Sequence, residues 1–228
     1  MSLVQELPQV ATQERQELLP FRIRLARGPQ DLQRAVEIRA SAYGRHLPHV
    51  GEALRTAEAE DHRSDVLLLV AERKFDHRMI GTLRLEPNFN GPLRIERETT
   101  LPHLLRDQKL VETSRLGVEG GTSGAMVTIS LVKAAFEICR ACNIDYTISV
   151  GRRSMAEVFR AMCFDVVDGP VRISYAKSTP LWIFCASVRG WESRLREGGH
   201  AQFDFIASTD HPDIDVDYAA VFEAFRRH

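Results

Sequence analysis

The stretch KLVETSRLGVEGGTSGAMVTISLVKAAFEICRAC, from Lys109 to Cys142, decides the fold of this chain. Leu110 to Val118 reads as a strand, and the run after Gly124 predicts a helix that is apolar over most of its surface. Between them lies a glycine-rich turn in which Thr122 or Ser123 is placed to cap the helix. Because free backbone N–H groups and the positive end of a helix dipole meet at such a turn, the pattern predicts a site for an anionic group, usually a phosphate.

Three polar residues of the strand, Glu112, Ser114 and Arg115, are candidates for chemistry. Charge in a strand beside a buried helix is costly unless it is paired or used. Two interpretations stay open: Glu112 and Arg115 form a structural ion pair beside a tight turn, or they belong to a functional site. The turn matches neither G-x-x-x-x-G-K-[ST] nor G-x-G-x-x-G, which argues against a nucleotide-hydrolysing loop and a dinucleotide fold.

The composition is that of a globular protein with one sizeable core. The chain has 228 residues, of which 44% are apolar and 27% charged, and its formal net charge is −1. This charge gives no electrostatic reason to expect nucleic acid as a partner. Residues 1–20 lack the pattern of a signal peptide, and no stretch has the length of a membrane span, so we expect a cytoplasmic protein.

Metal and redox sites are not expected from the sequence. The four cysteines lie in apolar surroundings, which predicts buried reduced thiols. Cys139 and Cys142 form a C-x-x-C without a second pair or a nearby histidine. His46 and His49 form an H-x-x-H, but Pro48 lies between them and no third ligand is obvious.

Strands alternating with well-formed helices predict an α/β or α+β sheet domain. Residues 44–65 read as a polar loop, which we interpret as a lid over a site, and Arg84 is unusual because it lies in a strand expected to be internal. Strands are predicted at 21–27, 66–71, 79–85, 144–150, 165–167, 171–175 and 181–188, and helices at 30–43, around 101–105 and from the capping box 154–157.

Two motifs in this order resemble a known family. Glu112-Thr113-Ser114-Arg115-Leu116 follows Gly81-Thr82-Leu83-Arg84-Leu85 and precedes Cys163-Phe164 and Gly169-Pro170. This E-x-S-R and G-x-x-R-L combination resembles the acyl-homoserine-lactone synthases and the related N-acyl amino acid synthases, over roughly residues 22–188. The resemblance implies the GNAT-like acyl-CoA N-acyltransferase fold, with a central mixed, mostly antiparallel sheet flanked by helices.

The resemblance also implies an activity and a set of site residues. It implies transfer of a fatty acyl group from a thioester, on acyl carrier protein or coenzyme A, to the amine of an amino acid, with no permanently bound cofactor. Glu112 is the candidate base, acting through a water, with Ser114 and Arg115 beside it. Arg39 and Arg84 are candidates to bind the carboxylate of the acceptor. The phosphopantetheine arm of the donor is expected at Val118, Gly120, Gly121 and Gly124.

The sequence departs from the family pattern in three places. The turn is acidic and lacks the arginine of acetyl-CoA enzymes, which disfavours acetyl-CoA and favours acyl carrier protein. Phe159 stands where many such enzymes have a tyrosine that protonates the leaving thiolate, so the general acid would come from elsewhere. Homoserine-lactone synthases have a Y-D-x-x-D pattern, against which this chain offers Tyr43, Glu60-Asp61 and Asp65. Because this match to the pattern is poor, it favours a free amino acid as acceptor.

Three alternative functions stay open. One is an acyl-homoserine-lactone synthase that uses S-adenosylmethionine, and another is an ordinary N-acetyltransferase. The third is a non-catalytic domain that binds an acyl group or a partner, which the retained Glu112 and Arg115 oppose. The acyl chain length, the acceptor and the oligomeric state are not specified by the sequence.

The sequence divides into a flexible lead-in at 1–20, an acyltransferase domain at 21–190 and a helical extension at 191–228. In the extension, Asp217 is expected to cap a last helix whose apolar side docks on the domain. Residues 213–217 alternate Asp with apolar residues, but a glycine and a closing glutamate are misplaced for a calcium loop. The apolar residues of this helix and the segment before it are Phe203, Phe205, Tyr218, Val221, Phe222 and Phe225.

Overall fold

An eight-stranded sheet forms the centre of the computed structural model, which describes residues 18–121, 124–176, 179–200, 203–207 and 210–226. The strand order is β6-β7-β5-β4-β3-β2-β1-β8. The β4–β5 and β1–β8 pairs are parallel and the other five are antiparallel, which confirms the mixed, mostly antiparallel sheet. The strands are β1 (Phe21–Leu25), β2 (Leu67–Arg73), β3 (Met79–Pro87), β4 (Leu110–Val118), β5 (Tyr146–Gly151), β6 (Asp165–Val171), β7 (Leu181–Ser187) and β8 (Ile214–Asp215).

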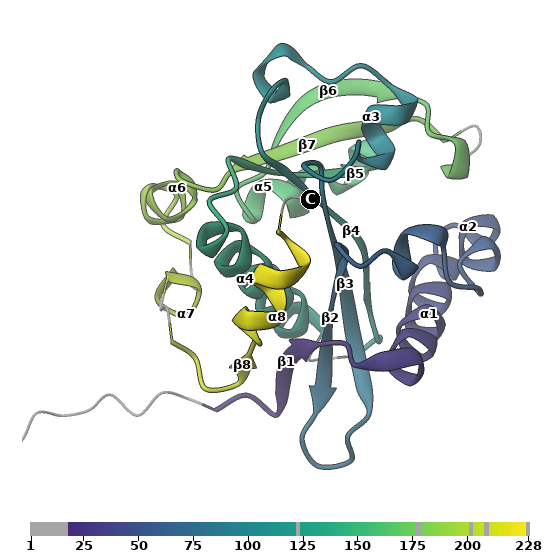
Figure 1. Cartoon of the computed structure of the whole chain (residues 1–228), viewed down its shortest axis with the longest axis vertical. Coiled ribbons are helices and arrows are strands. Elements are labelled where there is room, and N and C mark those ends of the chain that lie inside the picture. Colours follow the sequence, from purple (N-terminus) through teal and green to yellow (C-terminus); the bar gives the residue numbers. More distant parts are fainter. Residues whose placement is uncertain (1–17, 122–123, 177–178, 201–202, 208–209, 227–228) are drawn as a thin grey trace, which may run out of the picture.

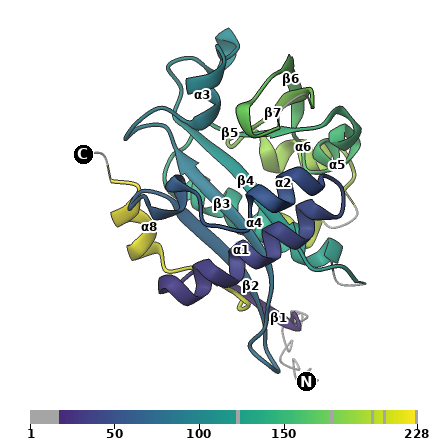
Figure 2. The same ribbon diagram turned by 90° about the vertical axis from the view of Figure 1, so that its right-hand side faces the viewer.

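Helices cover both faces of the sheet. On one face lie α1 (Gly28–Gly44) and α2 (Pro48–Ala53), and on the other lies α4 (Gly124–Ala141), with the C-terminal helices beside it (Figures 1 and 2). The shorter helical segments are η1 (Ala59–His62), α3 (Arg94–Glu98), η2 (His103–Leu105), η3 (Arg153–Met155), α5 (Ala156–Ala161), η4 (Ser174–Ala176), α6 (Trp191–Glu197), α7 (Phe203–Ala207) and α8 (Tyr218–Ala224).

The long helix α4 packs closely on the middle of the sheet because its apolar side chains meet a glycine there. A side chain at Gly81 of β3 would place its Cβ 2.6 Å from Val127 of α4, so the glycine permits the approach of the helix. Leu131 and Ala134 of α4 are fully buried in the main core. The helix therefore leaves the opposite face of β3 and β4 for the polar residues.

Strands β4 and β5 pair over only three residues each. The parallel ladder joins Leu110–Glu112 of β4 to Tyr146–Ile148 of β5, and no further pairs follow in these strands. Ser149 reaches across the start of the opening, where its hydroxyl donates to the carbonyl oxygen of Thr113 at 2.9 Å. Beyond this point the two strands separate, which opens the sheet next to Glu112.

Most predicted elements are confirmed, including a strand with the bounds 110–118 and antiparallel pairing between β2 and β3. Three predictions are wrong. Residues 171–175 are not a strand, because β6 ends at Val171 and a helical turn follows at 174–176. Ser154 caps no helix, because a 3-10 turn occupies 153–155 and α5 starts at Ala156 without a side-chain cap. The segment 44–65 is not only a loop, since it contains α2 and η1.

The C-terminal segment packs on the rest of the chain. Strand β8 pairs with β1 at the edge of the sheet, and the Asp217 side chain accepts from the Ala220 N–H at 3.1 Å, which confirms the predicted cap. Val221 and Phe225 are buried, and Phe225 contacts Phe89 edge to face. The predicted caps Thr122 and Ser123 lie outside the described residues, as do residues 1–17.

The four cysteines are free thiols, as predicted. Burial raises the pKa of Cys142 to about 11, so its thiol is protonated at neutral pH. Among the described residues, no helix combines the length and apolar character needed to cross a membrane.

Candidate active site

A cavity of about 250 Å³ occupies the opening between β4 and β5. Its polar part lies on the side of α1 and is lined by Glu112, Ser114, Arg115, Tyr43 and Tyr175. Its apolar part lies on the side of α4, so the cavity passes through the sheet from a charged surface to an apolar interior. The apolar part is lined by Val132, Ala135, Phe136, Met155, Phe159, Met162 and Phe164.

Glu112 lies at the point where β4 and β5 part. Burial raises the pKa of its carboxyl group to about 7, and the nearby Glu86 carboxylate adds to the effect. The backbone N–H of Ile95 hydrogen-bonds the carboxyl group, while its Oε2 atom has no hydrogen-bond partner among the described residues. A buried carboxyl group that titrates near neutral pH and faces a cavity has the properties of a general base.

Arg115 does not pair with Glu112, so the structural ion pair considered from the sequence is wrong. Its Nε and Nη2 atoms instead donate to the two carboxylate oxygens of Glu58, at 2.5 and 2.7 Å. Although burial opposes its charge, these bonds raise the pKa of the Arg115 guanidinium above its ordinary value. Its guanidinium also lies 4.6 Å from the ring centroid of Tyr175.

A bulge in β4 turns Arg115 toward the cavity. Its backbone φ is 57°, in the left-handed region, and the β3–β4 register shifts between Thr82 and Arg84. Successive side chains of a regular strand point to opposite faces, so without the bulge Ser114 and Arg115 could not both face the same side. A non-glycine residue held at positive φ in a central strand is a feature found at functional sites.

Arg39 and Arg84 lie behind the cavity and do not line it. Arg39 of α1 binds both carboxylate oxygens of Asp61 at 2.8 Å, and its side chain is 1% exposed. Arg84 donates to Asp61 at 3.2 Å, to Glu58 at 3.1 Å and to the Ser114 hydroxyl at 3.2 Å. The two arginines thus fix the acidic residues and Ser114 from behind, whereas Arg115 and Arg152 line the cavity.

Glu58 and Asp61 are the two acidic residues that organise these arginines. Sequence reasoning missed Glu58 and named Asp61 only beside Glu60. Although burial by itself acts in the opposite direction, hydrogen bonds from Arg115 hold the pKa of Glu58 well below its usual range. The charge of Arg39 lowers the pKa of Asp61, again against the effect of burial. The available signal was their spacing of three residues, which equals that of the D-x-x-D pattern with Glu58 in first place. The predicted match to the D-x-x-D pattern was Glu60-Asp61 with Asp65.

Phe159 has no hydroxyl group to offer, but two tyrosines lie at the polar end of the cavity. Phe159 lines the apolar part and stacks on Phe184, with ring centroids 4.1 Å apart. Tyr43 comes from α1 and Tyr175 from η4. Burial raises the pKa of Tyr175 to about 12, so its hydroxyl keeps its proton at neutral pH.

The predicted donor loop lies beside this cavity without lining it. Val118 ends β4, and its carbonyl oxygen accepts from Arg45 at 3.0 Å. Gly120 and Gly121 have open space where a side chain would lie, and Gly121 has a φ of 138°. Gly124 begins α4, with its N–H bonded to Gly121 at 3.2 Å.

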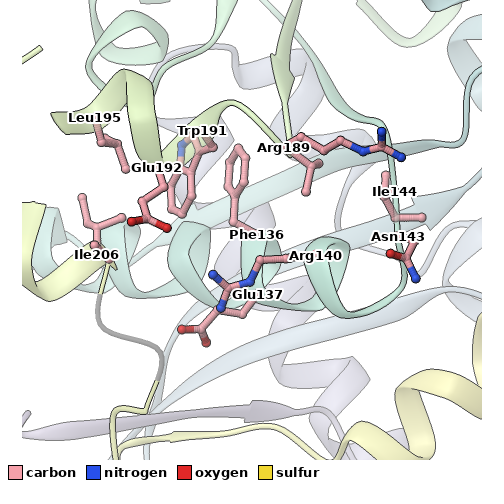
Figure 3. A pocket seen from close by; sticks show the side chains of 12 residues that line it. Phe136, Glu137, Arg140, Asn143, Ile144, Arg189, Trp191, Glu192, Leu195 and Ile206 are labelled. Atoms are coloured by element: carbon pink, nitrogen blue, oxygen red, sulfur yellow. The ribbon is translucent and has the colours of Figure 1, made fainter. Parts of the chain in front are cut away.

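A second cavity, of about 300 Å³, lies on the outer side of α4 and contains none of the predicted site residues. Phe136 and Trp191 stack with ring centroids 3.7 Å apart, and Figure 3 places them between α4 and α6. Glu137 and Arg140 approach the second cavity from α4 (Figure 3). Because Phe136 lines both cavities, it is part of the wall between them.

No group of three or more metal-ligating side chains suited to a metal ion occurs among the described residues. Glu58 and Asp61 are already bound to arginines, which compete with a cation for the same oxygens.

Solved structures share this fold, although the sequence matches no protein-family model and no curated protein. FeeM, an N-acyl amino acid synthase from uncultured soil microbes, superposes with a TM-score of 0.61 and 15% identity over 75% of this chain and 93% of FeeM. The chain has the fold of the GNAT-like acyltransferases. BjaI, a CoA-dependent acyl-homoserine lactone synthase solved with SAM and isopentyl-CoA, has a TM-score of 0.61 and 18% identity over 90% of this chain and 98% of BjaI.

The cavity joins an apolar compartment to a charged one through the opening between β4 and β5, with Glu112 at the junction. Of the residues predicted from the sequence, the structure brings Glu112, Ser114 and Arg115 together at the cavity and places Arg39 and Arg84 one layer behind.

Proposed function

We propose that this chain is an N-acyltransferase that moves a fatty acyl group from a thioester donor to the amine of an amino acid. The donor is acyl carrier protein or coenzyme A bearing the acyl group. The observation that carries the proposal is the cavity between β4 and β5, which has a buried titratable Glu112 between a polar and an apolar compartment. The likeness to FeeM, an N-acyl amino acid synthase, supports the same reading.

The two compartments suit the two halves of the reaction. An acyl chain fits the apolar side, whose lining of methionine and phenylalanine excludes water. An amino acid fits the polar side, where the Arg115 guanidinium offers the planar group that binds carboxylates. Their reacting atoms then meet beside Glu112, and holding them together removes much of the entropic barrier to the reaction.

The proposed chemical step is direct transfer. Above about pH 7 the Glu112 carboxylate is ionised and takes a proton from the amine, directly or through a water. The amine nitrogen then forms a bond with the thioester carbonyl carbon as the carbon–sulfur bond breaks. The nitrogen then loses its second proton, which passes through the Tyr175 hydroxyl or solvent to the leaving thiolate, so Tyr175 ends the step protonated. The products are the N-acyl amino acid and the free thiol of the donor.

The donor arm is assigned to the opening between the strands and to the neighbouring turn of Val118, Gly120, Gly121 and Gly124. Beyond Glu112, β4 has no β5 partner, so its backbone is available to hydrogen-bond an extended pantetheine arm and a developing oxyanion. The open space at Gly120 and Gly121 leaves room for the phosphate end of that arm.

A second candidate function is an acyl-homoserine-lactone synthase that uses S-adenosylmethionine. One observation favours it: Glu58 and Asp61 have the spacing of the D-x-x-D pattern and lie at the polar side of the site. The coverage of BjaI, solved with SAM and isopentyl-CoA, is also high. Against it, both carboxylates of this chain are already engaged by arginines.

Purified protein tests both candidates in one assay. Acyl-CoA and acyl carrier protein thioesters would each be offered with a mixture of amino acids or with S-adenosylmethionine, and thiol release and product mass would be measured. The proposal expects N-acyl amino acids from the wild type. N-acyl homoserine lactones would instead establish the second function. The absence of thiol release from both mixtures would contradict both functions.

Two variants separate catalysis from folding. Glu112→Gln removes the base and should lower the rate by about 10²-fold or more. Glu72→Gln is the matched control, because Glu72 is a carboxylate of the same sheet that is bound by Arg24 and does not line the cavity. Equal activity in the two variants would remove Glu112 from the mechanism.

A further inference from the structure

Glu86, a buried acidic residue on β3, has no part in the reaction described above. It lies directly across the antiparallel ladder from Glu112, since the two are partners in the β3–β4 register. Such partners have Cβ atoms about 4.5–5.5 Å apart and point to the same face of the sheet. Glu86 is 0% exposed and Glu112 is 6% exposed, so the structure places two carboxyl groups together out of contact with water.

Each carboxyl group of the pair has one oxygen without a hydrogen-bond partner among the described residues. Oε1 of Glu86 accepts from Arg63 at 2.6 Å, while Oε2 of Glu86 and Oε2 of Glu112 have no hydrogen-bond partner among the described residues. Arg63 is itself held by Asp65 through two bonds, at 2.9 and 2.8 Å. A buried oxygen without a partner is costly, and protonation of one of two neighbouring carboxylates removes the repulsion between their charges.

We infer that Glu86 is a positioning residue that forms a carboxyl dyad with Glu112 and sets the pH at which Glu112 becomes a base. The inference rests on the proposed function, because it assigns Glu86 a role through the proposed base. Glu86 is the member of the dyad that stays ionised, since Arg63 is hydrogen-bonded to Glu86 and not to Glu112. Glu112 is the member that binds and releases the proton.

The charges around the dyad support this division. Arg84 of β3 and Arg115 of β4 act on Glu112 and favour its ionised form, whereas Glu86 opposes it. Burial raises the pKa of Glu86 itself and Glu60 adds to this effect, while Arg84, Arg63 and Arg97 favour the ionised form. Tyr175 also faces Glu112, and the carboxylate acts on its hydroxyl. With Arg84 and Arg115 bound to Glu58, the nearby Glu86 carboxylate is the acidic group left to raise the proton affinity of Glu112.

The dyad makes Glu112 a stronger base. Above its pKa both carboxyl groups are ionised, and the pair accepts one proton from the substrate amine. The accepted proton resides on Glu112, while Glu86 stays ionised beside Arg63. The dyad therefore increases the proton affinity of Glu112 at the pH where the amine must be deprotonated.

The test replaces Glu86 with a neutral residue and follows the titration of Glu112. A unit charge about 5 Å away, at an effective dielectric constant of about 20, shifts a pKa by about two units, so Glu86→Gln should move the acid limb of the rate–pH profile down by about one to two units. Glu86→Leu should do the same, because Arg63 keeps its two bonds to Asp65 and is not left unpaired. Glu72→Gln should leave the limb where it is in the wild type.

A second readout does not depend on turnover. Difference infrared spectroscopy of the full chain would follow the protonated carboxyl band, assigned to Glu112 by its loss in Glu112→Gln. We expect its midpoint near pH 7 in the wild type and one to two units lower in Glu86→Gln. An unchanged midpoint in Glu86→Gln would overturn the dyad, even if the protein proves to be an active acyltransferase. A shifted midpoint without thiol release would retain the dyad and reject the proposed function.

Discussion

Removing the Glu58 carboxylate should destabilise the fold more than any exposed charge change. Glu58 accepts hydrogen bonds from Arg115 at 2.5 and 2.7 Å, from Arg84 at 3.1 Å and from Arg94 at 2.8 Å. In Glu58→Ala, Arg84 keeps Asp61 and Arg94 keeps Glu98, but Arg115 loses its only carboxylate among the described residues. Arg115 is 3% exposed, so the variant leaves a buried charge without a counter-ion.

The expected loss follows from that orphaned charge. Breaking a buried pair by removing one partner costs about 3–5 kcal/mol, which is a large fraction of the stability of a typical domain. Urea unfolding at pH 7 would measure it, and with a slope of about 3 kcal/mol/M the midpoint should fall by about 1–1.7 M. The control is Glu52→Ala, because Glu52 pairs with Arg55 at the surface and such pairs are worth about 0–1 kcal/mol.

The same change should depend on pH with a definite sign. The pKa of Glu58 is lower in the folded chain than in the unfolded chain, so its contribution is complete above the unfolded pKa of about 4.5 and is lost as the pH falls toward the folded value. The stability difference between wild type and Glu58→Ala should therefore shrink below pH 4.5. A Glu58→Ala midpoint close to that of Glu52→Ala at pH 7 would refute the reasoning.

Two further predictions concern packing around α4. Phe136→Leu shortens a side chain in the wall between the two cavities, so the variant should accept longer acyl chains than the wild type. Assays with acyl donors of increasing chain length measure this preference. An unchanged preference would exclude Phe136 as the end of the acyl pocket. Gly81→Ala places a Cβ 2.6 Å from Val127 and should lower the free energy of unfolding by about 1–3 kcal/mol, whereas Gly120→Ala, with open space around it, should cost less than half as much by the same urea assay.

The sequence predicted the core of the fold because the hydrophobic pattern there is strong. The apolar run of β2, its antiparallel pairing with β3 and the bounds of β4 all follow from alternation and turn residues. The site residues on β4 were found for a different reason, since Glu112 and Arg115 interrupt that pattern with charge. Their partners could not be found in the same way, because Glu58 and Asp61 lie in a segment without apolar periodicity and meet the arginines only through tertiary structure.

The orientation of Arg115 shows a second limit of periodicity. Alternation places Ser114 and Arg115 on opposite faces of β4, and an ion pair of Glu112 with Arg115 would have required the two to face each other. The bulge at Arg115 brings it to the polar side, where Glu58 binds it. No residue in the sequence signals this bulge, since β4 has its glycine at position 117 and not at 115.

The distribution of unpaired oxygens connects the stability of the site to its function. Four charged residues lie in the central strands β3 and β4, and each of them costs stability unless it is satisfied. The arginines, Arg84 and Arg115, each bind at least one carboxylate. Glu86 and Glu112 each retain a buried oxygen that has no partner in the part of the chain that the structure describes, and these two oxygens belong to cross-strand neighbours. If the pair were kept for structure, replacing both residues by leucine should lower the free energy of unfolding. A gain in stability together with a loss of acyl transfer would show that the unpaired oxygens are kept for chemistry.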